Sequence, residues 1–402
     1  MAPKSWAVKS LGSVLERVSC PVIPVPDVLY REIGIRSHGK GIFHKKPVLG
    51  KSLGNKRVFE VHGDCFVVNI VFAWEQAVAR TTSNEVGMIA SHRFPMYRPV
   101  DGLCDVDFLL YYFKTKKGKY LLELASPGGA GRNKTLGQAE FARLAFPMPS
   151  GKEQAKIAKM LSTWDKAIAV TEKLIANSKA QKKALMQQLL VGRKRLPGCR
   201  QKWKSIKLGE VARLNPQRPS EPSDSRVTFV PMDAVSDDAR LLRREVRNYQ
   251  DVSSGFTAFR DGDVLVAKIT PCFENGKGAH VDGLMNGIGF GSTEFHVLRA
   301  KKGIASRYIY HVTNSAEFRV RGEANMQGSA GQKRVPVDFL RSYGLRIPGT
   351  FDEQHKIAEV LDAADAITDA FSGMRNTFRT QRQALMQQLL TGKRRVKPDP
   401  AA

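Results

Sequence analysis

The sequence contains few cysteines, and no two of them are closely spaced. The chain of 402 residues contains 5 cysteines, and no two of them form a CxxC motif. They are Cys20, Cys65, Cys104, Cys199 and Cys272. An odd number of widely spaced cysteines excludes a disulfide framework and argues against a structural zinc site. We therefore expect no metal and a location in the reducing cytoplasm.

Long apolar runs are also missing. No uninterrupted hydrophobic stretch approaches the length that a membrane-spanning helix needs. Charged residues, among them Lys4, Lys9, Glu16 and Arg17, break up the first segment, which excludes a signal peptide. We expect no membrane partner.

Acidic residues are also few in comparison with basic residues. The chain has 38 Asp and Glu against 64 Lys and Arg, a formal net charge of +26. An excess this large indicates a polyanionic partner, with nucleic acid as the first candidate. Hydrophobic residues nevertheless make up 42% of the chain, which is ordinary for a globular protein of two or three domains.

The chain contains an internal repeat. The hexapeptide that starts at Glu153 returns at Glu353 with one change, and the heptapeptide 184–190 returns unchanged at 384–390. Between 153–195 and 353–395, 17 of 43 aligned residues are identical. Fainter matches, such as Trp6 with Trp203, link the preceding segments at offsets of 197 to 201. The sequence is therefore a tandem duplication.

The two repeated segments predict long helices. Apolar residues recur at alternating spacings of 4 and 3 from Ile157 and again from Ile357, which is the seam of a heptad repeat. About 38 residues at about 1.5 Å each give a rod of about 57 Å. Gly192 and Gly392 stand where helix C-caps are expected, and the basic triplets that follow suit a helix C-terminus. Gly373 alone interrupts the second run.

A narrow apolar seam on so long a helix needs a partner. We expect the two rods to pack antiparallel in a pseudo-twofold molecule. Because Lys182, Arg375 and Arg382 occupy seam positions, the alternative is that each rod packs on its own globular domain. The predicted parts are a first globular domain, a first helix, a second globular domain, a second helix and a tail, at 1–150, 151–195, 196–350, 351–395 and 396–402.

The globular segments predict a mixed α/β (α+β) fold. Strand patterns are strongest at 65–72, 263–269 and 290–298, and a Gly-Asp turn precedes the first two. The predicted fold is two similar domains separated by two long antiparallel helices.

Motifs for catalysis are largely missing. The glycine-rich stretch 128–135 resembles a phosphate loop but has Asn133 where the required glycine should stand. No dinucleotide fingerprint and no Asn-Pro-Pro-aromatic tetrad of an amino-methyltransferase occurs. Asp263 and Lys268 share a predicted strand in the manner of some nucleases, yet the first copy has Asn69 in place of Lys268. His38 and His44 lack further metal ligands at suitable spacing.

Basic clusters remain, and they recur in both halves. Arg can pair with guanine and Gln with adenine, whereas Lys suits phosphates. The candidate DNA-binding residues are Arg36, Lys40, Lys45, Lys46, Lys51, Arg132, Lys134, Arg243, Arg244, Lys268, Lys277, Gln332, Lys333 and Arg334.

The order of these features resembles the specificity (S) subunits of type I restriction-modification enzymes. The resemblance is carried by 203–211, 261–278, 289–295 and 328–335, followed by Glu353-Gln354-x-Lys356-Ile357-Ala358. Both repeats then close on Leu-Leu-x-Gly, at 189–192 and 389–392. The first globular segment is more divergent and looks like a different variety of target recognition domain.

The resemblance implies a non-catalytic subunit. Its two recognition domains would read the two halves of a bipartite, asymmetric target in double-stranded DNA, and the helices would set the gap. The helices would also bind two methyltransferase (modification) subunits, through Trp164, Leu185, Leu189, Leu385 and Leu389. S-adenosylmethionine, ATP and Mg would belong to partner subunits, including ATP-dependent restriction subunits, so this chain needs no cofactor of its own.

Two alternatives stay open from the residues. One is a metal-dependent nuclease that acts alone through Asp263 and Lys268. The other is an RNA-binding factor, which would fit the charge but would leave the paired rods without a purpose.

Overall fold

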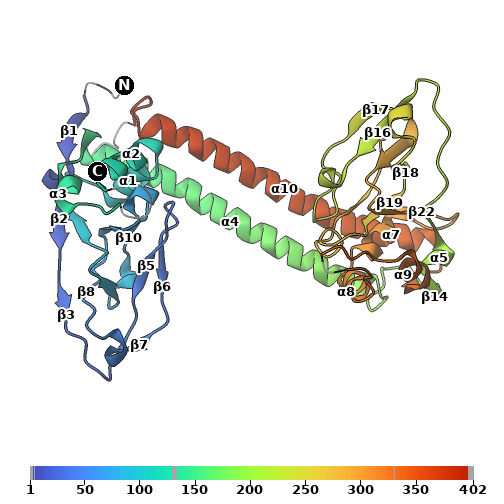
Figure 1. Ribbon diagram of the computed structural model, residues 1–402, viewed down its shortest axis with the longest axis horizontal. Coiled ribbons are helices and arrows are strands. Elements are labelled where there is room, and N and C mark those ends of the chain that lie inside the picture. The colour runs from blue at the N-terminus through green and yellow to red at the C-terminus, as the bar shows by residue number, and fades with distance from the viewer. Residues whose placement is uncertain (1–2, 4, 129–133, 330, 397–402) are drawn as a thin grey trace. The chain divides into compact units, whose positions relative to one another are not determined.

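A computed structural model describes residue 3 and residues 5–128, 134–329 and 331–396 (Figure 1). The chain divides into two compact units. Unit 1 comprises 1–171 and 374–402, and unit 2 comprises 172–373. Each unit therefore contains one globular part and portions of both long helices. Among the described residues, no helix combines the length and the hydropathy needed to cross a membrane.

The two predicted rods are confirmed as the longest helices. They are α4 (Gly151–Leu189) and α10 (Phe351–Leu389), each of 39 residues. Gly192 and Gly392 have left-handed φ values of 71° and 72°, as expected of C-cap glycines. Helix α10 continues through Gly373, so this glycine does not break the rod.

Within each unit, α4 and α10 run antiparallel and pack together. In unit 1 the ring of Trp164 packs edge-on against Phe378, with centroids 5.6 Å apart. In unit 2 the hydroxyls of Ser178 and Thr368 are 2.8 Å apart. The predicted antiparallel pairing is therefore confirmed within each unit.

Ion pairs explain the cations in the seam. Lys182 Nζ lies 2.6 Å from a carboxylate oxygen of Asp365 in unit 2, and Arg382 Nε lies 2.5 Å from Asp165 in unit 1. Lys182 and Arg382 thus each have an aspartate on the facing helix, and the two aspartates lie 200 positions apart in the sequence. These two cations do not prevent the pairing because the other helix neutralises them, whereas Arg375 donates to the neighbouring Asn376.

The helix ends also pack into the globular cores. Leu161 of α4 and Leu389 of α10 join the core of unit 1, whereas Leu361 of α10 and Leu189 of α4 join that of unit 2. Packing between the rods and packing onto globular domains were posed as alternatives, and the structure has both. Each core is closed by the start of one rod and the end of the other.

A buried glutamate fixes each helix start. Glu353 accepts two hydrogen bonds from the guanidinium of Arg195, at 2.6 and 2.9 Å, and one at 3.1 Å from Trp203 Nε1. Glu153 accepts two from Arg395, at 2.7 and 2.8 Å. The basic triplets were expected to interact with the helix C-termini. Arg195 and Arg395 instead bind the facing helix's first turn, because buried carboxylates there need a partner.

Unit 1 contains small antiparallel sheets with short helices packed against them. Its sheets have the strand orders β1-β13, β10-β9-β12-β2, β11-β8-β3, β4-β7 and β5-β6. The strands are β1 (Ala7–Ser10), β2 (Leu15–Val18), β3 (Pro21–Val22), β4 (Leu29–Tyr30), β5 (Ile33–Ile35), β6 (Ile42–His44), β7 (Val48–Leu49), β8 (Val58–Glu60), β9 (Phe66–Val68), β10 (Val78–Arg80), β11 (Ile89–Ser91), β12 (Met96–Pro99) and β13 (Ala145–Met148). The short helices are α1 (Val106–Phe113), α2 (Lys116–Leu124) and α3 (Gln138–Arg143).

Unit 2 contains fewer and larger sheets. Their strand orders are β14-β23, β15-β22-β19-β20 and β17-β16-β21-β18, and among the strand pairs of its described residues only β16 with β21 is parallel. The strands are β14 (Lys204–Lys207), β15 (Ala212–Leu214), β16 (Arg226–Val230), β17 (Glu245–Asn248), β18 (Thr257–Arg260), β19 (Val264–Ala267), β20 (Gly278–His280), β21 (Ile288–Gly291), β22 (Phe295–Ala300) and β23 (Gly344–Ile347). The helices are α5 (Leu208–Val211), α6 (Tyr249–Val252), α7 (Ser306–Thr313), α8 (Ala316–Ala324) and α9 (Val337–Ser342).

The predicted strands exist, but they are shorter than expected. The pattern at 65–72 yields only β9, because Asn69 Oδ1 accepts a hydrogen bond from the backbone N–H of Val71 and turns the chain. The stretch 290–298 divides into β21 and β22, since the Ser292 hydroxyl accepts from the N–H of Glu294. In both cases a side-chain turn ends the strand earlier than the sequence pattern predicts.

Candidate nucleic-acid interface

Three loops of unit 2 meet through backbone hydrogen bonds. They are 268–277 between β19 and β20, 292–294 between β21 and β22, and the described part of 326–335 (all but residue 330) between α8 and α9. The Lys268 N–H donates to the Glu294 carbonyl at 2.9 Å, and the Lys268 carbonyl accepts from Val335 at 2.8 Å. The Thr270 N–H donates to Lys333 at 2.9 Å. We call these loops the three-loop surface of unit 2.

The predicted residues on this surface differ in availability. Arg334 forms an ion pair of 2.8 Å with Glu294, and hydrogen bonding to that guanidinium lowers the pKa of the Glu294 carboxyl. Gln332 and Lys333 are exposed. Among the described residues, none forms an ion pair with the Lys333 ammonium. The side chains of Lys333 and Gln332 are therefore available to bind an external ligand, whereas Arg334 would first have to break its ion pair with Glu294.

Unit 1 repeats the backbone frame of these loops. The Ile70 N–H donates to the Arg93 carbonyl at 3.0 Å, and the Ile70 carbonyl accepts from Leu136 at 2.8 Å. This makes Ile70, and not Asn69, the counterpart of Lys268. The shift by one position arises because the two copies differ in loop length, which a fixed sequence offset does not reveal.

The side chains on the frame of unit 1 are different. Lys134 places its ammonium 5.8 Å from the ring centre of Trp74, within the range of a cation–π contact. Arg132 lies outside the described residues. The three-loop surface of unit 1 (69–77, 91–95 and the described part of 126–136) thus combines a lysine with an aromatic ring.

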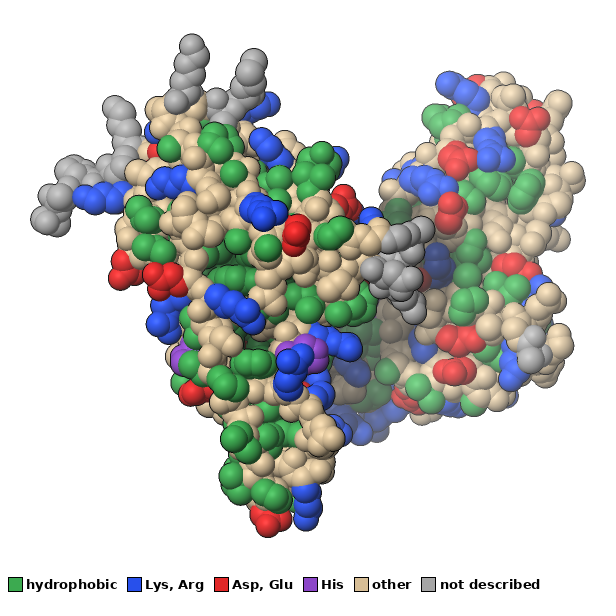
Figure 2. Space-filling model, turned by 60° about the vertical axis from the view of Figure 1, so that its left-hand side comes forward, with side chains coloured by type: hydrophobic (Ala, Val, Ile, Leu, Met, Phe, Trp, Pro, Cys, Tyr) green, Lys and Arg blue, Asp and Glu red, His purple; other side chains and the backbone are tan. Residues whose placement is uncertain are grey.

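The other basic cluster of unit 1 lies on and beside β5, β6 and β7. Lys45 pairs with the buried Glu32 at 3.0 Å, Lys51 lies 3.6 Å from Asp27, and Arg36 stacks on Phe43 at 4.8 Å. Lys40 and Lys46 are exposed. Figure 2 shows Lys and Arg side chains gathered beside a histidine on the face of unit 1 turned toward the viewer. This cluster is partly neutralised, and its remaining cations face solvent.

Three predicted residues of unit 2 lie off the three-loop surface or point inward from it. Arg243 pairs with Asp233 at 2.8 Å, and Arg244 donates to the Asp282 carbonyl at 2.9 Å. Lys277 donates to the backbone carbonyls of Met232 and Val235, at 3.3 and 2.9 Å. Lys277 therefore ties the 268–277 loop to the segment after β16.

Asp263, the carboxylate that the nuclease alternative requires, already accepts hydrogen bonds within the protein. Asp263 is 1% exposed and accepts two hydrogen bonds from Arg299, at 2.8 and 2.7 Å, and one from the N–H of Arg260. A metal ion at this carboxylate would have to displace Arg299. The geometry is that of a turn-stabilising aspartate.

One group of potential metal ligands is likewise neutralised. His311, Asp362 and Asp365 have ligand atoms within 4.8 Å of one another. However, Arg307 donates two hydrogen bonds to Asp362, and both Lys182 and Arg240 pair with Asp365. Three cations around two carboxylates make this cluster a poor cation site.

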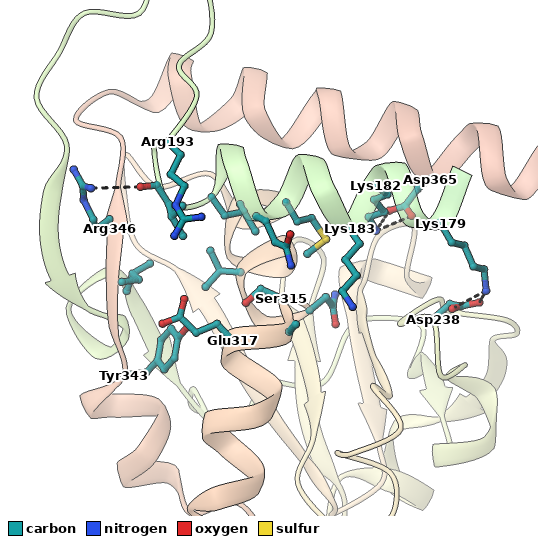
Figure 3. A pocket seen from close by; sticks show the side chains of 18 of the residues that line it. Lys179, Lys182, Lys183, Arg193, Asp238, Ser315, Glu317, Tyr343, Arg346 and Asp365 are labelled. Carbon is teal, nitrogen blue, oxygen red and sulfur yellow. Dashed lines mark hydrogen bonds and ion pairs between the residues drawn. The ribbon is translucent and has the colours of Figure 1, made fainter. Parts of the chain in front are cut away.

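Unit 2 also has a pocket of about 940 Å³ beside the end of α4 (Figure 3). Apolar side chains that include Met186, Leu190 and Leu345 line it. Lys179 at its rim is paired with Asp238. The side chains of Lys183 and Arg193 have no hydrogen bond or ion pair with any residue in the described part of the chain.

The predicted partner-binding residues are largely used by the fold. Leu189 and Leu389 are buried in the two cores, whereas Leu185 and Leu385 pack against them and stay half-buried. Trp164 is half-buried against Phe378. Leu174 and Met374, at equivalent positions of the two helices, are 38% and 46% exposed.

Sequence reasoning missed Arg319 and the role of Glu153 and Glu353, which it named only as repeated residues. That role could have been found, since the tryptophan, glutamate and arginine of each cluster recur in both halves. Arg319 gives no such signal, because residue 119 is a lysine in the first copy.

Comparison with known proteins agrees with this geometry. The sequence pattern of the Type I restriction modification DNA specificity domain matches residues 3–178 and again 200–376. The specificity subunits of the type I restriction enzymes EcoAI and EcoEI of Escherichia coli are each 36% identical over 192 residues, 47% of this chain. The match spans 32% of each relative, about a third of its length.

Solved structures support the fold over the whole chain. The HsdS subunit from Thermoanaerobacter tengcongensis has a TM-score of 0.50 and 15% identity, covering 98% of both chains. The type I S subunit from M. genitalium has a TM-score of 0.57 and 13% identity, covering 96% of both chains. With the specificity-domain pattern present in both halves, the chain belongs to the type I restriction-modification DNA specificity family.

Proposed function

We propose that this chain is the DNA specificity subunit of a type I restriction-modification enzyme and carries no active site of its own. The observation that supports this most strongly is the repeated three-loop surface. Both units have the same backbone frame, yet Lys268 and Glu294 in unit 2 correspond to Ile70 and Arg93 in unit 1. The same backbone frame thus occurs twice with different side chains, which suits a protein that reads two different DNA segments.

The proposed target is double-stranded DNA with two recognised segments separated by an unread gap. Lys333 and Lys134 would contact phosphates, because they are cations without carboxylate partners among the described residues. Gln332 would contact a base edge, since its exposed amide can donate and accept at once. The remaining basic residues predicted above would add phosphate contacts from both units.

The proposed protein partner is a methyltransferase subunit present in two copies. Leu174 and Met374 give the two rods an exposed apolar side chain at equivalent positions, which suits two copies of one partner. Trp164, Leu185 and Leu385 are the half-buried members of the predicted contact set. S-adenosylmethionine, ATP and Mg would be bound by the methyltransferase and restriction subunits of this cytoplasmic complex.

The deciding experiment is a methylation map. The chain is co-expressed with the methyltransferase encoded beside it, and methylated adenines are located in host DNA by single-molecule sequencing. We expect a bipartite motif. Exchanging the globular part of either unit for that of a relative should change only one half of the motif.

The control is the methyltransferase expressed alone, which should give no motif. Methylation that does not depend on this chain would overturn the proposal. Preferential binding of single-stranded RNA by the purified chain would favour the RNA-binding alternative, and metal-dependent cleavage of DNA by the chain alone would favour the nuclease.

A further inference from the structure

Arg319 of α8 holds one loop of the three-loop surface in unit 2. Its Nη1 donates to the carbonyl of Phe273 at 3.1 Å, and its Nη2 donates to that of Gly276 at 3.2 Å. Both acceptors belong to the 268–277 loop. The Asn314 side-chain oxygen accepts a further bond at 2.9 Å from Nη2, which orients the guanidinium.

The surroundings leave room for this arrangement. The guanidinium lies 4.9 Å from the ring centre of Phe273, which is fully buried. A Cβ at Gly322 would come within 2.2 Å of that ring. Glycine at this position of α8 therefore lets the Phe273 ring of the loop pack against the helix.

Arg319 differs from neighbouring arginines in what it binds. Arg195, Arg299 and Arg307 each donate to a carboxylate. Arg319 has no carboxylate partner among the described residues and donates only to carbonyl and amide oxygens. Burial lowers its pKa to about 10, so the guanidinium keeps its proton at neutral pH. An unneutralised positive charge thus lies beneath the loop, where it favours a nearby phosphate.

We infer that Arg319 is a positioning residue for sequence recognition: it fixes the 268–277 loop so that the exposed amide of Asn275 on that loop reads a base in one half of the target. This inference rests on the proposed function. A flexible loop could bind DNA through charge alone, but discrimination between bases needs side chains held in one geometry.

Unit 1 holds its equivalent loop by another route. The Gln76 amide of the loop donates to the Phe113 carbonyl at 2.8 Å, whereas Lys119, the counterpart of Arg319, pairs with Glu123. Changes at Arg319 should therefore affect one half of the target only.

The test compares Arg319→Lys with the matched control Lys119→Met, each in the full chain co-expressed with the methyltransferase. A lysine keeps the charge but has one ammonium in place of a fork that spans two carbonyls. We expect R319K to reduce base discrimination about tenfold at one or more positions of one half of the motif. The other half should be unchanged, and K119M should match the parent.

A purely structural role would give a different result. Methylation would then decrease at all sites while the motif stayed the same, and that outcome would overturn the inference. Hydrogen exchange of the DNA-free complex gives an independent readout. The backbone amides of Phe273, Asn275 and Lys277, which donate within the loop, should exchange about tenfold faster in R319K. Unchanged exchange would also overturn it.

If R319K does not fold, Asn314→Ala serves as a second variant for the same test. It removes one acceptor of the guanidinium and leaves the loop carbonyls in place, so a smaller loss of discrimination in the same half is expected. A parent motif that neither R319K nor N314A alters would refute this inference alone. If the parent chain directs no methylation, the proposed function fails instead.

Discussion

The three-loop surfaces of the two units share a backbone and differ in chemistry. At the centre of each frame one residue donates its N–H to the second loop and accepts through its carbonyl from the third. That residue is Ile70 in unit 1 and Lys268 in unit 2. Backbone bonds do not depend on side-chain identity, so the frame survives exchanges that replace an aliphatic residue by a cation.

The same contrast holds for the contacts that support the loops. In unit 1 the 69–77 loop supplies the donor, Gln76, whereas in unit 2 the helix supplies it, Arg319. The contacts at the starts of the rods, in contrast, are the same in both units. Glu153 pairs with Arg395, and the equivalent Glu353 pairs with Arg195. Divergence is thus concentrated in the three-loop surfaces and their supporting contacts, and the parts that close the two cores are alike.

Truncating the equivalent core leucines tests whether the two cores are closed in the same way. Leu161→Ala and Leu361→Ala should each reduce the free energy of unfolding of their own unit by about 3 kcal/mol, because both side chains are fully buried. Hydrogen exchange of α1 and α7 would assign the loss to a unit. The control Val360→Ala, at a partly exposed position, should change stability by less than about 0.5 kcal/mol. Equal losses in both units from either variant would contradict the division into two cores.

The seam ion pairs should distinguish the units. Lys182→Met leaves the buried carboxylate of Asp365 with Arg240 as its one ion-pair partner among the described residues, so we expect a loss of about 2 kcal/mol in unit 2. Arg382→Met leaves Asp165, which is 43% exposed and still accepts from Tyr111, so the loss in unit 1 should be below about 1 kcal/mol. Denaturant unfolding of both variants measures the difference. A larger loss for R382M would refute this reasoning.

Acid should weaken unit 2 through His311. This side chain is fully buried beside Asp362, and burial lowers its pKa below the ordinary value of 6.5. Below pH 6.5 the unfolded chain binds a proton that the folded chain does not, so stability is complete above that pH. It should decrease as pH decreases, by up to about 1.4 kcal/mol per pH unit.

Tyr111 offers the matched exchange, since it occupies the corresponding position of α1 in unit 1 and donates to Asp165. His311→Gln should weaken the acid dependence of unit 2, and Tyr111→His should introduce one into unit 1. Thermal unfolding at pH 7.5 and pH 5.5 measures both. Identical pH profiles for the parent and H311Q would show that the other buried histidines, His280 and His296, carry the effect.

Single lysines on the two surfaces should have the smallest effects. Lys333→Ala and Lys134→Ala should each weaken DNA binding by the complex about fivefold and reduce the salt slope by about one. Lys302→Ala, an exposed lysine of unit 2 outside the three loops, is the control and should leave the slope unchanged. A change of motif in place of a uniform loss would mean that the lysine contacts a base and not a phosphate.

Features with a local signature were predictable from the sequence. The rods follow from spacings of 3 and 4 residues, and their ends follow from Gly192 and Gly392, because helix periodicity and capping involve neighbours in the chain. The strands were placed but overextended, since hydropathy does not show that Asn69 and Ser292 turn the backbone.

The predicted site residues depend on partners distant in sequence. Arg334 and Lys333 are adjacent, yet one forms an ion pair with Glu294, 40 positions away, and the other is free among the described residues. Lys277 was grouped with the candidate DNA contacts although its ammonium bonds to Val235 inside the unit. A list of basic residues cannot distinguish these cases.

The duplication, the two long helices, the basic character and the family resemblance can all be inferred from the sequence. Each of these is a matter of composition, local periodicity or order along the chain. Only the folded structure shows that three loops meet around Lys268, that Arg319 supports one of them and that aspartates pair with Lys182 and Arg382. Those outcomes depend on which groups share a desolvated space, and burial makes a charge find a partner wherever in the chain that partner lies.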